Sequence, residues 1–192
     1  MGVETTAARA NGNGLTRKQQ HDPLQWMRFY WEQQSDDDPS GFLAMTSVLR
    51  IHHLMTTAVD NRLRAEFAIS LTDYQILKAL QLSDSGTWLL SRVAWHLMVH
   101  ATTVTLAADR LETKHLVQRH IHPTDRRATL LTITGQGRRL ADEATESLSK
   151  VDFGLPGLAP SQARALTTTI ARVRADAGDL DRSYGSAPDG SA

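Results

Sequence analysis

The sequence has no cysteine among its 192 residues. This absence excludes disulfides, thiolate zinc sites, iron–sulfur clusters and cysteine nucleophiles, and it fits a reducing cytoplasm. A long apolar run is also missing. The longest stretch without Asp, Glu, Lys or Arg is the 16 residues from Val93 to Ala108, which is shorter than a membrane span. The first twenty residues lack the apolar segment of a signal peptide. We therefore expect a soluble, cytoplasmic protein that has no membrane partner.

Sequence motifs of the common enzyme classes are absent as well: there is no nucleophile elbow, P-loop or dinucleotide fingerprint. His96 and His100 have the spacing of a zinc peptidase, but Leu97 stands where the general base would be glutamate. His120 and His122 would share one face of a strand, yet no carboxylate pattern completes a metal site. We expect no enzymatic activity, no cofactor and no bound metal.

Net charge of either sign is lacking too, since 21 basic residues balance 21 acidic ones. Such a balance argues against a polyanionic partner only if the charges are spread evenly. They are not: residues 92–139 hold eight basic and three acidic residues, for a net charge of +5, whereas the flanks carry −2 and −3. The basic segment is a candidate nucleic-acid surface, and a solvated helix face is the alternative.

Apolar residues recur at three- and four-residue steps through most of the chain, which predicts a largely helical fold. The first two helices are expected over 22–34 and 41–67. Thr72 and Gln75 form a possible capping box for the third, Thr87 can cap a short fourth, and the fifth is expected over 102–114. A tight connection at 98–100 would join the fourth helix to the fifth.

The apolar period then changes from 3.6 to 2, which predicts two short strands, Val117–Ile121 and Thr129–Ile133. A basic, turn-rich segment at 122–127 joins them. Thr134 can cap a long helix that follows, and a last helix is expected over 161–177. The predicted fold is mainly α with a small β-wing: a winged helix-turn-helix DNA-binding domain with further helices at its N- and C-terminal sides.

The chemistry of DNA contact explains this arrangement. A helix fits the major groove, where the short hydroxyl side chains of Thr102, Thr103 and Thr105 can reach bases or phosphates. Arg126 and Arg127 at the hairpin tip can enter the minor groove, whose negative potential attracts arginine. Further candidate phosphate contacts are Arg110, Lys114 and Arg119.

Several motifs stand in an order and spacing that resemble the MarR family of transcriptional regulators. They are Thr103-Val104-Thr105, Asp109-Arg110-Leu111-Glu112, Asp125-Arg126-Arg127 and Ile133-Thr134-x-x-Gly137, within a resemblance that covers about residues 41–177. The resemblance implies a homodimer whose winged domains read a palindromic operator in double-stranded DNA. It places His100, Ala101, Thr102, Thr103 and Thr105 at the major groove. It also implies that Asp125 pairs with Arg127, which enters the minor groove.

Three positions depart from the family pattern. Lys114-His115 replaces a usual glycine before the wing, at a place that favours positive φ, which His tolerates better than most residues. His100 stands where a small capping residue is usual, and we expect it to cap poorly. Leu106 replaces a common arginine or polar residue, so one phosphate contact is expected to be missing.

The resemblance also suggests a small-molecule effector, because MarR-like dimers often hold aromatic or phenolic anions between the dimer helices and the DNA-binding domain. The candidate lining residues are Met45, His52, Met55, Tyr74 and Trp95. For His52, packing at the edge of the dimer core is the alternative. The expected domains are disordered ends at 1–20 and 181–192, dimerisation helices at 21–70 and 135–180, and the winged domain at 71–134.

The sequence therefore predicts a dimeric regulator that represses its own or neighbouring genes and that a small molecule releases from DNA. The alternative is a metal- or ligand-binding dimer whose winged domain does not read DNA.

Overall fold

The computed structural model describes residues 22–179, so the ends predicted to be disordered lie outside the described residues. Contacts divide the chain into two units, one up to Leu54 and one from Met55 onward, and helix α2 belongs to both. In chain order the elements are α1 (Pro23–Gln34), α2 (Ser40–Phe67), α3 (Leu71–Leu82), β1 (Thr87–Leu89), α4 (Leu90–His96), α5 (Ala101–Thr113), β2 (Val117–Ile121), β3 (Thr129–Ile133), α6 (Gly135–Ser149), a 3-10 turn (Asp152–Gly154) and α7 (Pro160–Asp176). The mainly helical fold with a small β-wing is as predicted.

The first unit contains α1 and the beginning of α2. Asp22 caps α1 by accepting the backbone N–H of Leu24 at 3.0 Å. Trp31 stacks on Phe42 with ring centroids 5.2 Å apart and donates its indole N–H to the carbonyl of Asp37. Asp38 accepts both the backbone N–H and the hydroxyl of Ser40, and these two hydrogen bonds lower the pKa of its carboxyl. The acidic run 36–38 therefore lies between the two helices, and Asp38 holds the first residue of α2.

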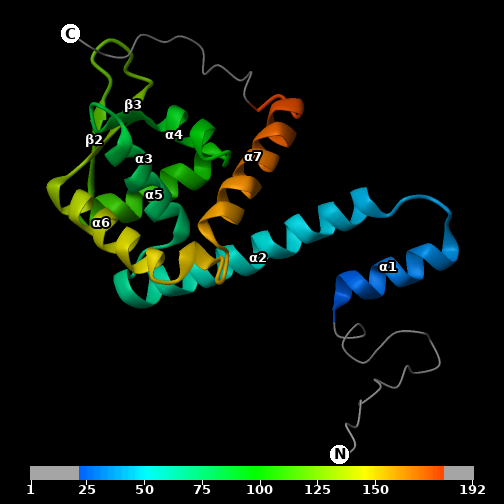
Figure 1. The fold of residues 1–192 in the computed structure, drawn as a ribbon. Coiled ribbons are helices and arrows are strands. Elements are labelled where there is room, and N and C mark those ends of the chain that lie inside the picture. Colours follow the sequence, from blue (N-terminus) through cyan, green and yellow to red (C-terminus); the bar gives the residue numbers. More distant parts are fainter. Residues whose placement is uncertain (1–21, 180–192) are drawn as a thin grey trace, which may run out of the picture. The chain divides into compact units, whose positions relative to one another are not determined.

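The second unit has a single apolar core, to which α2, α3, α4, α5, α6 and the strands contribute (Figure 1). The largest fully buried side chains are Leu63, Ile69, Ile76, Leu77, Leu80, Val93, Val104, Leu111, Leu116, Val117, Leu131 and Leu148. Helices α3 and α6 pack together, as do α4 and α5, and α5 lies against β2. This core holds the helix-turn-helix and the wing in one body.

The cap of α3 differs from the prediction. Ser70 rather than Thr72 is the N-cap residue, since its backbone is extended and its hydroxyl accepts the N–H of Asp73 at 3.1 Å. Asp73 completes the capping box by accepting the N–H of Ser70 at 2.9 Å. Thr72 lies inside the first turn of the helix. The correct pattern, Ser70-x-x-Asp73, begins two residues earlier than the one proposed from the sequence.

The wing has three strands, not two, because Thr87 does not cap a helix but begins strand β1. The sheet order is β1-β3-β2, and every pair is antiparallel. Thr87 lies opposite Thr132, with their hydroxyls 2.9 Å apart. Helix α4 starts at Leu90 without a side-chain cap. Three residues are too few to show an alternating pattern, so only pairing with β3 reveals this strand.

The root of the wing is joined tightly to the start of α6. Thr134 caps α6 as predicted, since its hydroxyl accepts the N–H of Gly137 at 3.0 Å and donates to the carbonyls of His115 and Leu116. The Thr134 N–H also donates to the Leu116 carbonyl at 3.0 Å. Gly137 faces this carbonyl so closely that a Cβ there would lie 2.2 Å from its oxygen.

Helix α7 is the last helix of the described residues, and none of its residues is buried. Gly178 follows it in the left-handed conformation, with φ +74°, as expected for a residue that terminates a helix. Across residues 22–179, no helix combines the length and the apolar character needed to cross a membrane.

Candidate nucleic-acid interface

Helix α5 presents one buried and one exposed face. Val104, Ala107, Ala108 and Leu111 face the core. The exposed side chains at the start of the helix are the five predicted for the major groove: His100, Ala101, Thr102, Thr103 and Thr105. The apolar period therefore leaves these residues together on the outer surface of the unit.

His100 is the N-cap of α5, which corrects the expectation that it caps poorly. Its Nδ1 accepts the N–H of Thr102 at 3.3 Å and lies 2.5 Å from the Thr102 hydroxyl oxygen. A neutral imidazole can do this because its unprotonated nitrogen is an acceptor. The cap keeps the Thr102 hydroxyl against its own helix.

The three predicted phosphate contacts outside the hairpin tip have partners within the chain. Arg110 donates to the buried carboxylate of Asp73 at 2.8 Å, and Lys114 donates to the carbonyl of Ala68. Arg119 pairs with Asp109 at 2.6 Å and with Glu112 at 3.7 Å. These cations hold α5 to α3, to the residue after α2 and to β2, and the charges of Arg110 and Arg119 are partly neutralised by their carboxylate partners.

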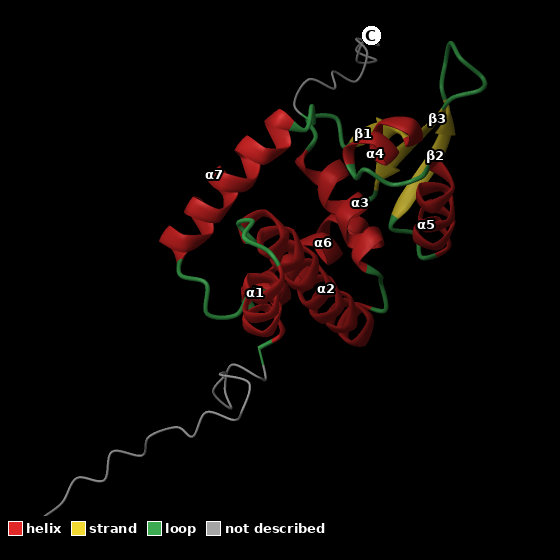
Figure 2. Cartoon of the chain, turned by 90° about the vertical axis from the view of Figure 1, so that its right-hand side faces the viewer, coloured by secondary structure: helices red, strands yellow, loops and turns green. Residues whose placement is uncertain are grey.

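The hairpin tip, residues 122–128, stands clear of the helices of its unit and lies on the same side as α5 (Figure 2). Arg126 and Arg127 are exposed, and within residues 22–179 no side-chain partner is recorded for either guanidinium. Asp125 accepts the backbone N–H of Arg127 at 2.9 Å instead of pairing with its guanidinium, which differs from the family expectation. Asp125 therefore shapes the turn and leaves both arginine side chains available.

His122 also shapes the tip, a role that sequence reasoning missed. Its Nδ1 lies 3.4 Å from the backbone nitrogen of Thr124 and 3.3 Å from that of Asp125, and it accepts from both N–H groups. A histidine directly before Pro-Thr-Asp is the signal that could have suggested such a cap. In the part of the chain described, no three His, Asp or Glu side chains gather closely enough to hold a metal ion.

His115 makes the connection from α5 to the wing, with φ +58°. This confirms the expectation that the position before the wing favours positive φ. The residue adopts the conformation that the usual glycine would adopt, at some cost in backbone strain. The N–H groups of His115 and Leu116 donate to the carbonyls of Glu112 and Leu111, both at 2.9 Å, and so close the end of α5.

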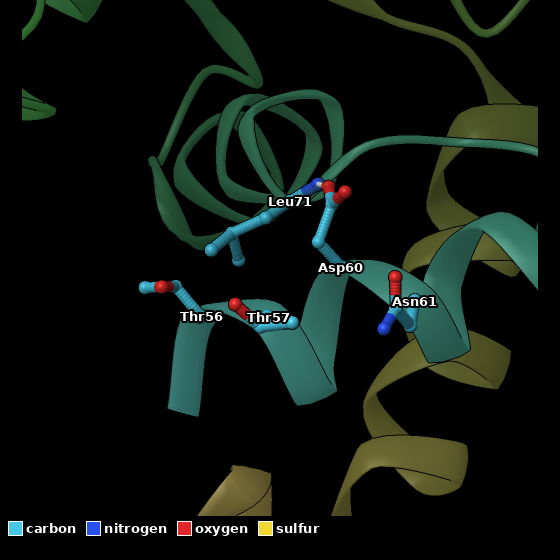
Figure 3. A pocket seen from close by; sticks show the side chains of 5 residues that line it. All are labelled: Thr56, Thr57, Asp60, Asn61 and Leu71. Atoms are coloured by element: carbon cyan, nitrogen blue, oxygen red, sulfur yellow. Dashed lines mark hydrogen bonds between the residues drawn. The ribbon is translucent and has the colours of Figure 1, made fainter. Parts of the chain in front are cut away.

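A hollow of about 320 Å³ lies at the corner between α2 and α3 (Figure 3). Its lining residues are Thr56, Thr57, Asp60, Asn61 and Leu71. Partial burial raises the pKa of Asp60, but the hydrogen bonds from the Arg64 side chain and the Leu71 N–H outweigh that effect and keep the pKa below its ordinary value. The carboxylate is therefore charged and disfavours an anion in this hollow.

None of the five predicted ligand-binding residues lines this hollow. Met45 and His52 belong to the first unit, and both are exposed. In the second unit Met55 is half-buried, and Trp95 on α4 is exposed. Tyr74 lies in the core, with its hydroxyl 3.0 Å from that of Thr145 on α6. Of the three residues in the second unit, Met55 is thus half-buried, Trp95 is exposed and Tyr74 belongs to the core.

Comparison with known proteins begins with the helix-turn-helix and the wing. The MarR family model matches residues 69–129. YhbI of Bacillus subtilis, described as an uncharacterised helix-turn-helix-type transcriptional regulator, is 31% identical over 85 residues. That match covers 44% of this chain and 55% of YhbI, so it spans about half the length of this relative.

Two solved structures are similar in fold at lower identity. Sco3205 of Streptomyces coelicolor, a MarR family transcriptional regulator solved in complex with DNA, has a TM-score of 0.63 at 20% identity. The likeness covers 80% of this chain and 98% of that one. BpsR of Bordetella bronchiseptica, whose DNA binding is regulated by 6-hydroxynicotinic acid, has a TM-score of 0.58 at 22% identity and covers 67% and 90% of the two chains.

A third structure is similar in both fold and sequence. It is Sco5413 of Streptomyces coelicolor, a MarR family transcriptional regulator, with a TM-score of 0.67 and 31% identity. The likeness covers 74% of this chain and 98% of that structure, and therefore includes nearly all of the relative. Together with the family match over the helix-turn-helix and the exposed wing, it shows that this chain belongs to the MarR family of DNA-binding transcriptional regulators.

Proposed function

We propose that the protein binds a palindromic operator in double-stranded DNA as a cytoplasmic homodimer and represses its own or neighbouring genes. Helix α5 would occupy the major groove, and Arg126 and Arg127 would reach the adjacent minor groove. The observation that carries the proposal is the pair of exposed arginines at a hairpin tip beside the exposed face of a helix-turn-helix. The DNA complex of Sco3205, a protein of the same fold, supports it.

The proposed major-groove contacts remain the five residues at the start of α5. Arg110, Lys114 and Arg119 would contribute less to phosphate binding than the tip arginines, because each already has a partner in the chain. Their proposed role is to hold α5 and the wing in a fixed relation, so that one protomer presents both elements to the DNA together. A palindrome then requires a second copy.

Two exposed apolar faces support dimerisation through the proposed segments 21–70 and 135–180. The early part of α2 exposes Phe42, Met45, Val48, Leu49, Ile51 and Leu54. Helix α7 exposes Leu166, Ile170 and Val173 along one stripe. Apolar surface of this extent on helices is costly in water, and its burial against a second copy would remove that cost.

A charged substitution on the α7 stripe tests the dimer. Ile170→Glu should raise the dissociation constant of the dimer by at least about tenfold, because burial of an isoleucine side chain contributes roughly 1.5–3 kcal/mol. Thr168→Glu, on the opposite face of the same helix, is the matched control and should leave the constant unchanged. Sedimentation equilibrium over a dilution series measures both. Equal behaviour of the two variants would exclude this face from the interface.

The proposed effector is a small aromatic or phenolic acid, for which the regulation of BpsR by 6-hydroxynicotinic acid is the supporting parallel. Met45, His52, Met55, Tyr74 and Trp95 remain the proposed lining residues. An effector would act by binding more tightly to a dimer conformation whose half-site spacing does not match the operator. The difference between its affinities for the two dimer conformations sets how far the equilibrium between them shifts. Release of a preformed DNA complex by a series of such acids is the measurement.

DNA binding itself is tested by gel shift with the upstream intergenic DNA of the protein's own gene. We expect a retarded complex. The protein should bind this DNA at least about a thousandfold more tightly than a random duplex, and the affinity should fall steeply as the salt concentration rises. A metal- or ligand-binding dimer that does not read DNA would show equal, weak affinity for both duplexes. That outcome would contradict the proposal.

A further inference from the structure

We infer that the recognition helix reads thymine methyl groups through an apolar strip, with Leu106 as its specificity-determining residue. This inference rests on the proposed function and names the base chemistry of the operator. The apolar strip consists of Leu106 and the methyl group of Thr102, which lies one helical turn earlier. It predicts half-sites that present thymines to α5 in the major groove.

The strip lies on the exposed face of α5. Leu106 is 56% exposed although its neighbours Val104, Ala107 and Ala108 are buried. Residues four positions apart lie on one side of a helix, so Leu106 continues the exposed surface that begins at Thr102. The strip therefore lies among the side chains proposed for the major groove.

The polar groups around the strip are largely occupied within the chain. The Thr105 hydroxyl donates to the carbonyl of Ala101 at 3.1 Å, and the Thr102 hydroxyl lies 2.5 Å from Nδ1 of His100. A threonine held in this way still presents its methyl group. In the described part of the chain, Thr103 is the one threonine of the three for which no such partner is recorded.

The charged groups of α5 are occupied as well. Arg110 pairs with Asp73, and Asp109 pairs with Arg119. The helix thus lacks the free arginine or lysine that would read guanine, whose major-groove edge carries two acceptors. Thymine is the base that offers an apolar group in the same groove, its C5-methyl. The chemistry of the exposed face therefore favours thymine over guanine.

Deoxyuridine provides a direct test, because it lacks the methyl group but pairs like thymine. The probe is a duplex that the wild-type protein selects from a random pool, made again with deoxyuridine at each thymine of one half-site in turn. Burial of one methyl corresponds to about fourfold in affinity. We expect the wild-type dissociation constant to rise about fourfold at the contacted thymines, and to stay unchanged at the others.

Leu106→Ala identifies the residue that makes the contact. Its affinity for the thymine duplex should fall by at least the same factor, and deoxyuridine should then cause no further loss at the position that Leu106 contacts. Leu82→Ala is the matched control, since Leu82 is 73% exposed at the end of α3 and outside the strip. It should keep the full deoxyuridine effect. Both leucines are exposed, so thermal melting should show both variants folded.

The outcomes separate the two proposals. If the wild-type protein selects no sequence from the pool, the proposed function and this inference both fail. If it selects a sequence and deoxyuridine has no effect anywhere, the inference fails and the proposed function stands. If deoxyuridine costs the Leu106→Ala variant as much as the wild type at every position, Leu106 is not the reader.

Discussion

Arg127→Ala should lower the affinity for the operator by about 1–3 kcal/mol, or roughly 5- to 150-fold, and leave the dimer intact. The guanidinium stands at the exposed hairpin tip, and within residues 22–179 it has no hydrogen bond or ion pair for the substitution to remove. Its backbone N–H still donates to Asp125, and the turn should therefore keep its shape. The expected loss comes from the minor-groove contact itself.

Two further variants distinguish this contact from a general loss of charge. Arg127→Lys keeps the charge but not the planar group, and we expect it to recover only part of the affinity. Arg164→Ala, on exposed α7, removes the same charge far along the chain and should have little effect. Titrations at several salt concentrations measure all three, with a salt slope reduced by about one for Arg127→Ala. Unchanged affinity would show that the wing tip does not touch DNA.

Gly137→Ala should destabilise the winged domain by about 1–3 kcal/mol or more. The added Cβ would lie 2.2 Å from the carbonyl oxygen of Leu116 and 2.9 Å from a side-chain carbon of Ile133. The carbonyl cannot move easily, because it accepts both the N–H and the hydroxyl of Thr134. Relief of the clash therefore requires α6 to shift from the root of the wing, and this shift breaks the cap.

Gly135→Ala provides the control in the same turn of α6. Its Cβ would meet nothing closer than an Arg139 side-chain nitrogen at 3.8 Å. Alanine is the better helix former, so stability should be unchanged or higher by up to about 1 kcal/mol. Urea unfolding followed by circular dichroism measures both variants. Equal midpoints of unfolding would mean that the root of the wing tolerates a side chain and that Gly137 does not lie close against the Leu116 carbonyl.

The positions of most helices and strands were predictable from the sequence, because the spacing of apolar residues can be read within a short stretch of the chain. The first helix was predicted over 22–34 and runs from Pro23 to Gln34, and both predicted wing strands have the observed bounds. The two errors also have local reasons. The segment from Ser70 to Gln75 contains two overlapping cap patterns, Ser70-x-x-Asp73 and Thr72-x-x-Gln75, and β1 is too short to carry a period.

The candidate site was only partly predictable for a different reason. The exposed face of α5 follows from its period, and the basic tip follows from composition. The role of a cation depends on its neighbours, however, and Arg110 pairs with an aspartate 37 positions away in the sequence. No local pattern indicates that Arg110 and Arg119 are held by carboxylates while Arg126 and Arg127 are not.

The sequence by itself determined the order of the helices and of the two longer wing strands, the family and the position of the basic segment, since each depends on residue type and spacing along the chain. Only the tertiary structure decided which charges within that segment face outward. Packing α5 against α3 and β2 brings Asp73, Asp109 and Glu112 to the nearby cations and leaves the hairpin tip without such partners. The segment charge of +5 is therefore not spread over one face: the free cations of the hairpin stand at its tip, whereas helix α5 exposes the apolar side chain of Leu106.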